Sequence, residues 1–272
     1  VGLPEETLDS WIEGIGKILE LGSDHALTVH PLSIVPNTPF AKEEYKDKYG
    51  LKYVPTPAPA GGNTYPDASE GEIDFVCHQS NSFTTQDYID MYFFAKGIVI
   101  PHHYHGVSQV VATYLQREHD IPLIEFYKLL FDWSKNSGTV FNKEYEDHTN
   151  SLKSSLFNMK TWGRPIEGGD DFHFQDNGAT AATLYKNIDD FYKQIKMLCL
   201  AKYNVDVEEA LKFNTEYICS IDSDGQVDLN EIEVFFKEIE KGENHLILGS
   251  RFLGKDLIKY DYKILNNIGT KL

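Results

Sequence analysis

The stretch that decides the fold runs from Val1 to Phe40 and reads VGLPEETLDSWIEGIGKILELGSDHALTVHPLSIVPNTPF. Its opening, Gly2 to Pro4, predicts the end of a strand, because proline lacks a backbone N–H and glycine adopts unusual backbone angles. Apolar residues at helical spacing then predict a helix, with acidic residues in its first turn and Gly22 after its last. A short strand is expected from Ala26 to His30. A helix followed by a strand over a short loop is half of a β-α-β crossover, which predicts a parallel sheet.

This stretch also carries a family resemblance. The run GLPEET, the helix with Trp11 and the following DHALTVHPLSIVPNTPFA resemble the last β-α-β unit of the radical S-adenosylmethionine (radical SAM) barrel, where one strand ends in GLPGxT and the next reads roughly xISLYPLxxxPGTPL. The residues from EYKDKYG to the helices beyond residue 84 are similar, more loosely, to the C-terminal region of the cobalamin-binding branch. The resemblance implies an α/β fragment, the last β-α-β unit of a partial TIM-like barrel, followed by a mainly α-helical C-terminal region.

The chain departs from that family at the cluster motif, which is CxxxCxxC. Its three cysteines, Cys77, Cys199 and Cys219, have no close spacing, so they cannot bind a 4Fe–4S cluster through the usual ligands. Val1 falls where a strand should already be ending. The chain is therefore expected to be the C-terminal portion of a longer enzyme, whose other part carries most of the barrel, the cluster and any cobalamin domain. Glu5 stands where the family usually has glycine.

The resemblance also implies a place for S-adenosylmethionine. In α/β barrels, ligands lie at the C-terminal ends of the strands. The two strand tips of this unit would line the adenine and methionine parts of the cofactor, and ordinary strand-end packing is the alternative. The candidate cofactor-binding residues are Gly2, Leu3, Pro4, His30, Pro31 and Leu32.

Composition divides the chain into three parts. Residues 1–40 are read as the C-terminal end of the barrel, residues 41–71 as a proline-rich linker and residues 72–272 as a mainly helical domain. The linker contains YVPTPAPAGGNTYPDASEGE, whose prolines, glycines and lack of helical period predict a loop.

Local patterns place the elements of the third part. Residues 72–78 alternate between apolar and polar and predict a strand, and DFHFQ, residues 171–175, suggests a shorter one. A capping signal at Thr84 to Asp87 opens a helix that Gly97 and Pro101 should end. Further helices are expected over residues 105–119, from Pro122 onward, and over 180–203 and 205–217, whereas the segment 139–161 is more polar.

The net charge of the chain limits the kinds of partner that are expected. A net charge of −17 argues against a nucleic-acid backbone or an anionic membrane as a main partner. The family resemblance implies a small-molecule substrate. No run of eighteen apolar residues is present, which predicts no transmembrane helix, and no signal peptide is visible. Three scattered cysteines suit a reducing compartment, so a cytoplasmic location is expected.

The sharpest local motif is SIDSDGQVDLNE, residues 220–231. It fits a calcium-binding EF-hand loop, which needs alternating oxygen ligands, a glycine at the sharp turn and a bidentate glutamate at the end. Ser220 stands where the first ligand is normally aspartate, and no second loop is found, so an acidic turn is the alternative. The candidate calcium ligands are Asp222, Asp224, Asp228 and Glu231.

A second motif is the histidine group His102, His103 and His105. Neutral imidazole nitrogen suits zinc, iron or nickel, so two of the three could bind a metal. No cysteine or carboxylate has the matching spacing. Solvated histidines at a junction between loop and helix are therefore favoured.

The sequence predicts the C-terminal part of a radical SAM enzyme that completes the barrel and covers the substrate, and that is inert alone. The alternatives are a calcium-binding EF-hand-like regulatory module and a helical interaction domain without chemistry. The sequence does not identify the substrate, the reaction, the use of cobalamin or the oligomeric state. A methyl transfer is among the candidate reactions.

Overall fold

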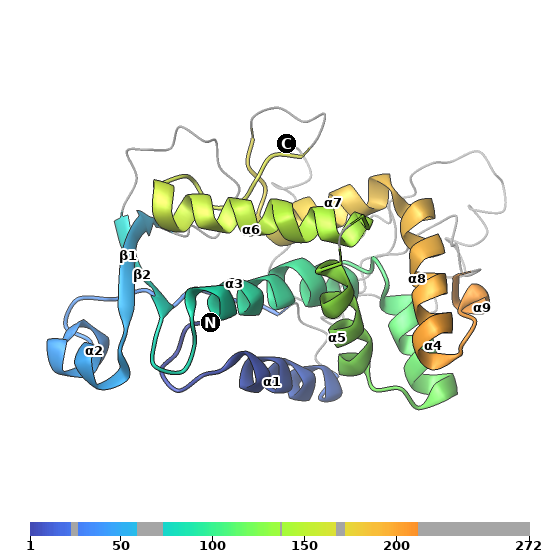
Figure 1. Ribbon diagram of the computed structural model, residues 1–272, viewed down its shortest axis with the longest axis horizontal. Helices are drawn as coiled ribbons and strands as arrows, with labels where there is room; N and C mark the ends of the chain where they lie inside the picture. The colour runs from blue at the N-terminus through green and yellow to red at the C-terminus, as the bar shows by residue number, and fades with distance from the viewer. Residues whose placement is uncertain (23–26, 59–72, 137, 167–171, 212–272) are drawn as a thin grey trace, which may run out of the picture. The chain divides into compact units, whose positions relative to one another are not determined.

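The computed structural model describes residues 1–22, 27–58, 73–136, 138–166 and 172–211 (Figure 1). The chain divides into two compact units, Val1–Asn214 and Thr215–Leu272, and all described residues belong to the first. The calcium loop predicted at residues 220–231 lies outside the described residues.

A helix buried on every side forms the centre of this unit. Helix α3 spans Thr85–Phe93, and every residue from Tyr88 to Phe93 is buried. The predicted cap is confirmed, because the Thr84 hydroxyl accepts from the Asp87 N–H and the Asp87 carboxylate accepts from the Thr84 N–H. Helices α1 and α6 both pack against α3 (Figure 1), which explains how the residues from Tyr88 to Phe93 are buried on different faces of this helix.

The chain continues from α3 directly into η2, a π-helix over Phe94–Tyr104. The expectation that Gly97 and Pro101 end the helix is wrong. Proline breaks an α-helix because its ring clashes with the carbonyl four residues earlier, and the wider π turn moves that carbonyl away. A Cβ at Gly97 would lie 2.3 Å from the Phe93 ring, so glycine lets this ring pack against the backbone of η2.

Two strands form an antiparallel pair. Strand β1 spans Lys52–Pro57 and β2 spans Ile73–Gln79, with Tyr53 opposite Cys77. Strand β2 confirms the strand that the alternation over residues 72–78 predicts. The loop predicted for the linker is wrong over β1, because its prolines are tolerated in a strand that β2 pairs along one edge only.

The N-terminal stretch is partly as predicted. Helix α1 spans Leu8–Glu20, begins with a Thr7–Ser10 capping box and is followed by Gly22 at φ 65°. The described part of the predicted strand, residues 27–30, forms no regular strand. The backbone nevertheless pairs, since the Val1 amino group donates to the His30 carbonyl and the Leu32 N–H donates to the Val1 carbonyl, a pattern that parallel chains form. The Cys77 N–H donates to the Leu32 carbonyl at 2.9 Å, which continues the pairing to β2.

Helices make up most of the remaining described residues. The helix expected over 180–203 is wrong as one element, because it breaks at Asn187, whose side chain donates to the Thr183 carbonyl at 3.0 Å and competes with the helix backbone. Among the described residues, no helix is long and apolar enough to cross a bilayer. The remaining elements are η1 Pro39–Ala41, α2 Glu43–Tyr49, α4 Gln109–His119, α5 Leu123–Ser134, α6 Val140–Asn158, α7 Asp176–Lys186, α8 Ile188–Tyr203 and α9 Glu208–Leu211.

Candidate functional site

The six residues assigned to S-adenosylmethionine lie on two segments that the backbone holds together. The two hydrogen bonds between them, from the Val1 amino group to His30 and from Leu32 to Val1, are each 3.0 Å long. The side chain of Leu3 is 48% exposed and His30 is also exposed. The structure thus brings the two tips together, and their assignment to the cofactor stays a prediction. The half-buried members are Pro4, Pro31 and Leu32.

Gly2 has a packing role at these tips. It adopts φ 91°, and a Cβ there would lie 3.1 Å from the Cys77 carbonyl oxygen and 3.3 Å from the Tyr88 ring. This is the strand-end packing that the sequence left as the alternative. The N–H groups of Gly2 and Leu3 both donate to the Glu6 carboxylate, at 3.0 and 3.4 Å, so Glu6 fixes the turn and was not foreseen.

Glu5 adopts φ 66°, in the left-handed region. That region disfavours residues with a Cβ and suits glycine. The glycine usual at this position in the radical SAM family therefore has a conformational reason, and Glu5 keeps the same backbone at a cost.

The three clustered histidines differ in exposure: His102 is buried, His103 is half-buried and His105 is exposed. His102 is buried, its Nδ1 lies 2.9 Å from the Ser108 hydroxyl, and burial lowers the pKa of its imidazole to about 3. The π-helix turns this ring into the aromatic core, so the expectation of a solvated ring is wrong for His102. Nδ1 of His103 lies 2.9 Å from the Tyr127 hydroxyl. Among the described residues, no group of His, Cys, Asp and Glu could hold a metal ion. The rings beside His102 are Phe141 and Phe191.

A cluster of buried polar side chains lies where η2, α6, α7 and the segment around residue 164 meet. We call it the polar cluster. The Arg164 guanidinium forms an ion pair with Glu144 and donates to the Thr180 hydroxyl at 3.2 Å. The Ser151 hydroxyl contacts the Asp176 carboxylate at 3.2 Å. The polar cluster comprises Lys96, Glu144, His148, Ser151, Arg164, Asp176 and Thr180.

Burial controls protonation in the polar cluster. It raises the pKa of Asp176 to about 6, against the opposing influence of Arg164, Ser151 and Lys96. Burial lowers the pKa of His148 well below its ordinary value, and the positive charges of Arg164 and Lys96 lower it further. His148 is therefore neutral at pH 7. Such shifts are concentrated at functional sites, although structural ion pairs also produce them.

Several atoms of the polar cluster have no hydrogen-bond partner among the described residues. They are buried, so each costs about 1–3 kcal/mol unless water or a ligand satisfies it. Nearly all buried polar groups in native proteins have a hydrogen-bond partner, either in the protein or in ordered water. The unpartnered atoms are Nδ1 and Nε2 of His148, Oε1 of Glu144 and Nε of Arg164.

A cavity of about 540 Å³ opens beside the polar cluster, between α6 and residues 160–165. Ser151 and Arg164 belong both to the polar cluster and to the cavity wall. The Arg164 backbone exchanges two hydrogen bonds with Phe174, at 3.0 and 2.9 Å, which brings His173 to the wall. The cavity is thus built from a helix and a paired segment, and its volume lies in the range of small-molecule sites.

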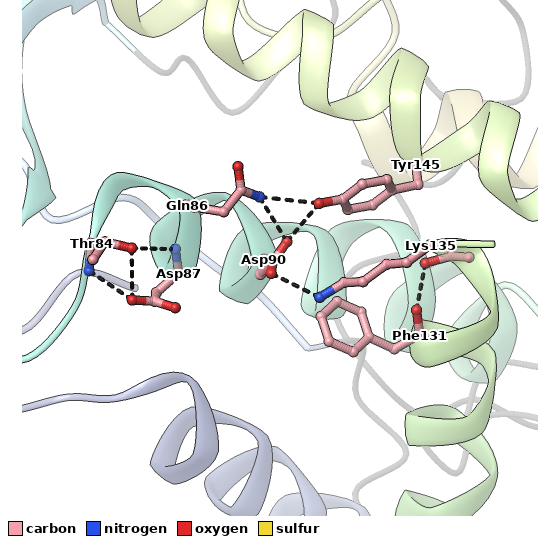
Figure 2. A network of polar contacts seen from close by, with 8 residues as sticks. Thr84, Gln86, Asp87, Asp90, Phe131, Lys135 and Tyr145 are labelled. Carbon is pink, nitrogen blue, oxygen red and sulfur yellow. Dashed lines mark hydrogen bonds and ion pairs between the residues drawn. The ribbon is translucent and has the colours of Figure 1, made fainter. Parts of the chain in front are cut away.

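Another polar network is purely structural (Figure 2). Asp90 of α3 is 94% buried and accepts hydrogen bonds from Lys135, Tyr145 and Gln86 at 2.8, 2.9 and 3.1 Å. The Lys135 ammonium also lies 4.2 Å from the centre of the Phe131 ring. Because Asp90 is fully partnered, this network ties α3 to α6 and to the end of α5 and offers nothing to a ligand.

Known proteins extend the sequence resemblance. The cobalamin-dependent radical SAM methyltransferase TokK of Streptomyces tokunonensis is 30% identical over 133 residues, which are 49% of this chain and 19% of that protein. The 2-(S-pantetheinyl)-carbapenam-3-carboxylate methyltransferase of Streptantibioticus cattleyicolor is 29% identical over 130 residues, 48% of this chain and 19% of the relative. The chain is distantly related to the cobalamin-dependent radical SAM methyltransferases. The predicted relation to the cobalamin-binding branch of the radical SAM family is thereby confirmed.

The radical SAM relation has limited extent. The matched segment spans about one fifth, 19%, of the length of each of these methyltransferases. No family model matches the chain. The relation supports a role connected with radical SAM chemistry, and the activity of the whole protein is a matter for proposal.

Sequence reasoning missed the polar cluster because its members come from segments far apart in the chain. One signal was available on the helix now called α6. Glu144, His148 and Ser151 recur at intervals of four and three residues, which places polar side chains on one helical face. That face also carries buried apolar residues, so polar groups at core positions were the clue to a buried site.

Proposed function

We propose that this chain is the C-terminal part of a radical SAM enzyme of the cobalamin-dependent branch, acting in methyl transfer to a small molecule. The observation that supports the proposal is the relation to TokK and the carbapenam methyltransferase. The parallel backbone pairing of Val1 with His30 and Leu32 agrees with a β-α-β unit at the end of a barrel.

The cysteines of the described residues do not suit an iron–sulfur cluster. Cys77 and Cys199 are both buried, and burial raises the pKa of their thiols to about 11 and about 12. A cluster is held by thiolates, which these side chains resist forming. In the proposal, the cluster is held by residues outside this sequence, and no step of the reaction is assigned to Cys77 or Cys199.

The role proposed for the chain itself is to close the barrel, contact S-adenosylmethionine and cover the substrate. Leu3 and His30 are exposed at the tips and are the side chains available for that contact. When bound, the cofactor would supply hydrogen abstraction from the substrate. The chain contributes by positioning these reactants and by excluding water through its helical part. A substrate with a carboxylate is proposed from the name of the carbapenam-3-carboxylate methyltransferase.

The first test is the coding region upstream of Val1. The proposal expects a CxxxCxxC motif roughly 150 residues or more before it, a distance set by the size of the barrel. The full protein, reconstituted with iron and sulfide, should show the absorbance and paramagnetic resonance of a 4Fe–4S cluster. An upstream region without that motif would refute the proposal.

The second test concerns the tips. Leu3→Arg in the reconstituted full protein should weaken binding of S-adenosylmethionine by at least about tenfold, measured by calorimetry, because it places a bulky charge at an apolar contact. Leu21→Arg is the matched control, since Leu21 is 84% exposed at the other end of α1. Equal affinities for the two variants would show that the tips do not contact the cofactor.

A further inference from the structure

The cavity beside the polar cluster carries an inference that does not depend on the proposed function. Its volume of about 540 Å³ suits a small molecule. Its walls come from α6 and from residues 160–165 and 173, within one compact unit.

Two residues of the cavity wall, Lys160 and Arg164, carry cationic hydrogen-bond donors. The Lys160 ammonium makes no hydrogen bond or ion pair within the part of the chain that is described. Arg164 is nine-tenths buried and uses Nη2 for Glu144 and Thr180, and its Nε has no partner among the described residues. Nδ1 of His173 is likewise buried without a partner there.

The charges on the wall reverse the balance of the whole protein. The chain has 42 acidic residues against 25 lysines and arginines, yet the wall has Lys160 and Arg164 against Asp147 as its carboxylate. Glu144 forms an ion pair with Arg164 and holds the guanidinium in place, and the Nε of Arg164 has no partner among the described residues. Guanidinium and ammonium groups with free donors are the groups that recognise oxyanions.

We propose that this cavity binds a small molecule through an anionic carboxylate or phosphate group, which Lys160 and Arg164 recognise together. His173 and the Asn150 amide, which also lies on the wall, supply further donors to the same molecule. Because the Asp147 carboxylate is also on the wall, the anionic group of the ligand must point away from it. This site is separate from the strand tips assigned to S-adenosylmethionine, because its residues come from α6 and the segment after it.

Calorimetric titration of the full protein with malonate and with inorganic phosphate tests the proposal. We expect saturable binding of at least one probe, and the preferred probe identifies the ligand as a carboxylate or a phosphate. Lys160→Ala should weaken this binding by at least about tenfold, as expected for loss of a charge-assisted hydrogen bond. Lys160 is exposed, so the melting temperature of the ligand-free protein should not change.

Lys153→Ala is the matched control. Lys153 is exposed on α6, the helix that lines the cavity, and is absent from the cavity wall. Its replacement by alanine changes the net charge by the same amount as Lys160→Ala. It should leave the affinity unchanged. Asp147→Asn should tighten binding severalfold, because it removes the carboxylate from the wall.

Arg164 also supports the fold, so its substitution is kept conservative. Arg164→Lys retains the positive charge beside Glu144 but loses the planar fork, and it should weaken binding of the preferred probe. Absence of saturable binding by both probes up to ~10 mM would overturn the proposal. Equal weakening by Lys160→Ala and Lys153→Ala would also overturn it, since it would reflect net charge rather than a site.

Discussion

Removing the guanidinium of Arg164 should destabilise the protein strongly. The side chains of Arg164 and Glu144 are only 10% and 2% exposed, so Arg164→Met leaves a buried carboxylate without its cation. Breaking a buried pair in this way typically costs about 3–5 kcal/mol, against a total stability of about 5–15 kcal/mol for a domain. Urea unfolding followed by circular dichroism at pH 7 should show this loss.

The loss should depend on pH. Burial raises the pKa of Glu144, and Arg164 opposes that increase, so removing Arg164 raises the pKa further. A carboxyl group whose pKa is raised in the folded state is favoured when protonated, and its stabilising contribution is lost as pH rises. The cost of Arg164→Met should therefore be largest at pH 7 and decrease toward pH 5.

A double variant separates the pair from the packing. Glu144→Leu with Arg164→Met replaces both charges by apolar groups, which in buried pairs is often neutral or stabilising. It should recover most of the stability that Arg164→Met loses, and the pH dependence that comes from Glu144 should be absent. Lys153→Met, at an exposed position of α6, is the control and should change stability by less than about 0.5 kcal/mol. A cost for Arg164→Met below about 1 kcal/mol at pH 7, or one that grows on acidification, would refute the argument.

Four further outcomes are expected, each read as the free energy of unfolding or the melting temperature. The pKa of His102 falls from its ordinary value to about 3 in the folded state, so its contribution to the free energy of unfolding is fully present above pH 6.5 and should decrease by about 2–3 kcal/mol by pH 4.5. His102→Asn should remove that decrease, while the similar decrease caused by His148 remains. Asp90→Asn should cost about 1–2 kcal/mol in urea unfolding, because the charge that Lys135 contacts is lost while an acceptor oxygen remains; no change would show that the network of Figure 2 is dispensable. Glu5→Gly should stabilise by about 0.5–1 kcal/mol, as the strain at φ 66° outweighs the added chain entropy. If residues 220–231 bind calcium, millimolar calcium should raise the melting temperature and Glu231→Gln should abolish the effect; a constant melting temperature would dismiss the loop.

Local signals predicted the elements that local interactions form. The Thr84–Asp87 cap, the end of α1 at Gly22 and the start of α5 after Pro122 were all readable, because each depends on residues within one turn. Strand β1 was not readable, since its prolines predict a loop and its hydrogen bonds depend on β2, beyond the linker.

The π-helix was also hidden from the sequence. Gly97 and Pro101 are helix-ending residues by propensity, and only the packing of Phe93 against the bare backbone of Gly97 shows why the helix continues. The polar cluster was hidden for a different reason, because no motif links Lys96 to Glu144 or to Asp176. The candidate site is therefore a property of the tertiary fold, while the family relation is a property of the sequence.

The π-helix η2 gives the chain tolerance to changes in length at one position. Deleting a residue from an α-helix such as α3 turns every following side chain by about 100° and moves buried residues to the surface. Deleting one from η2 can instead convert a five-residue hydrogen-bonded turn into a four-residue turn, with the helix still continuous. Length differences between related chains should therefore be found in η2 rather than in α3, and evolution can adjust the register of α4 and the helices after it there without rebuilding the core.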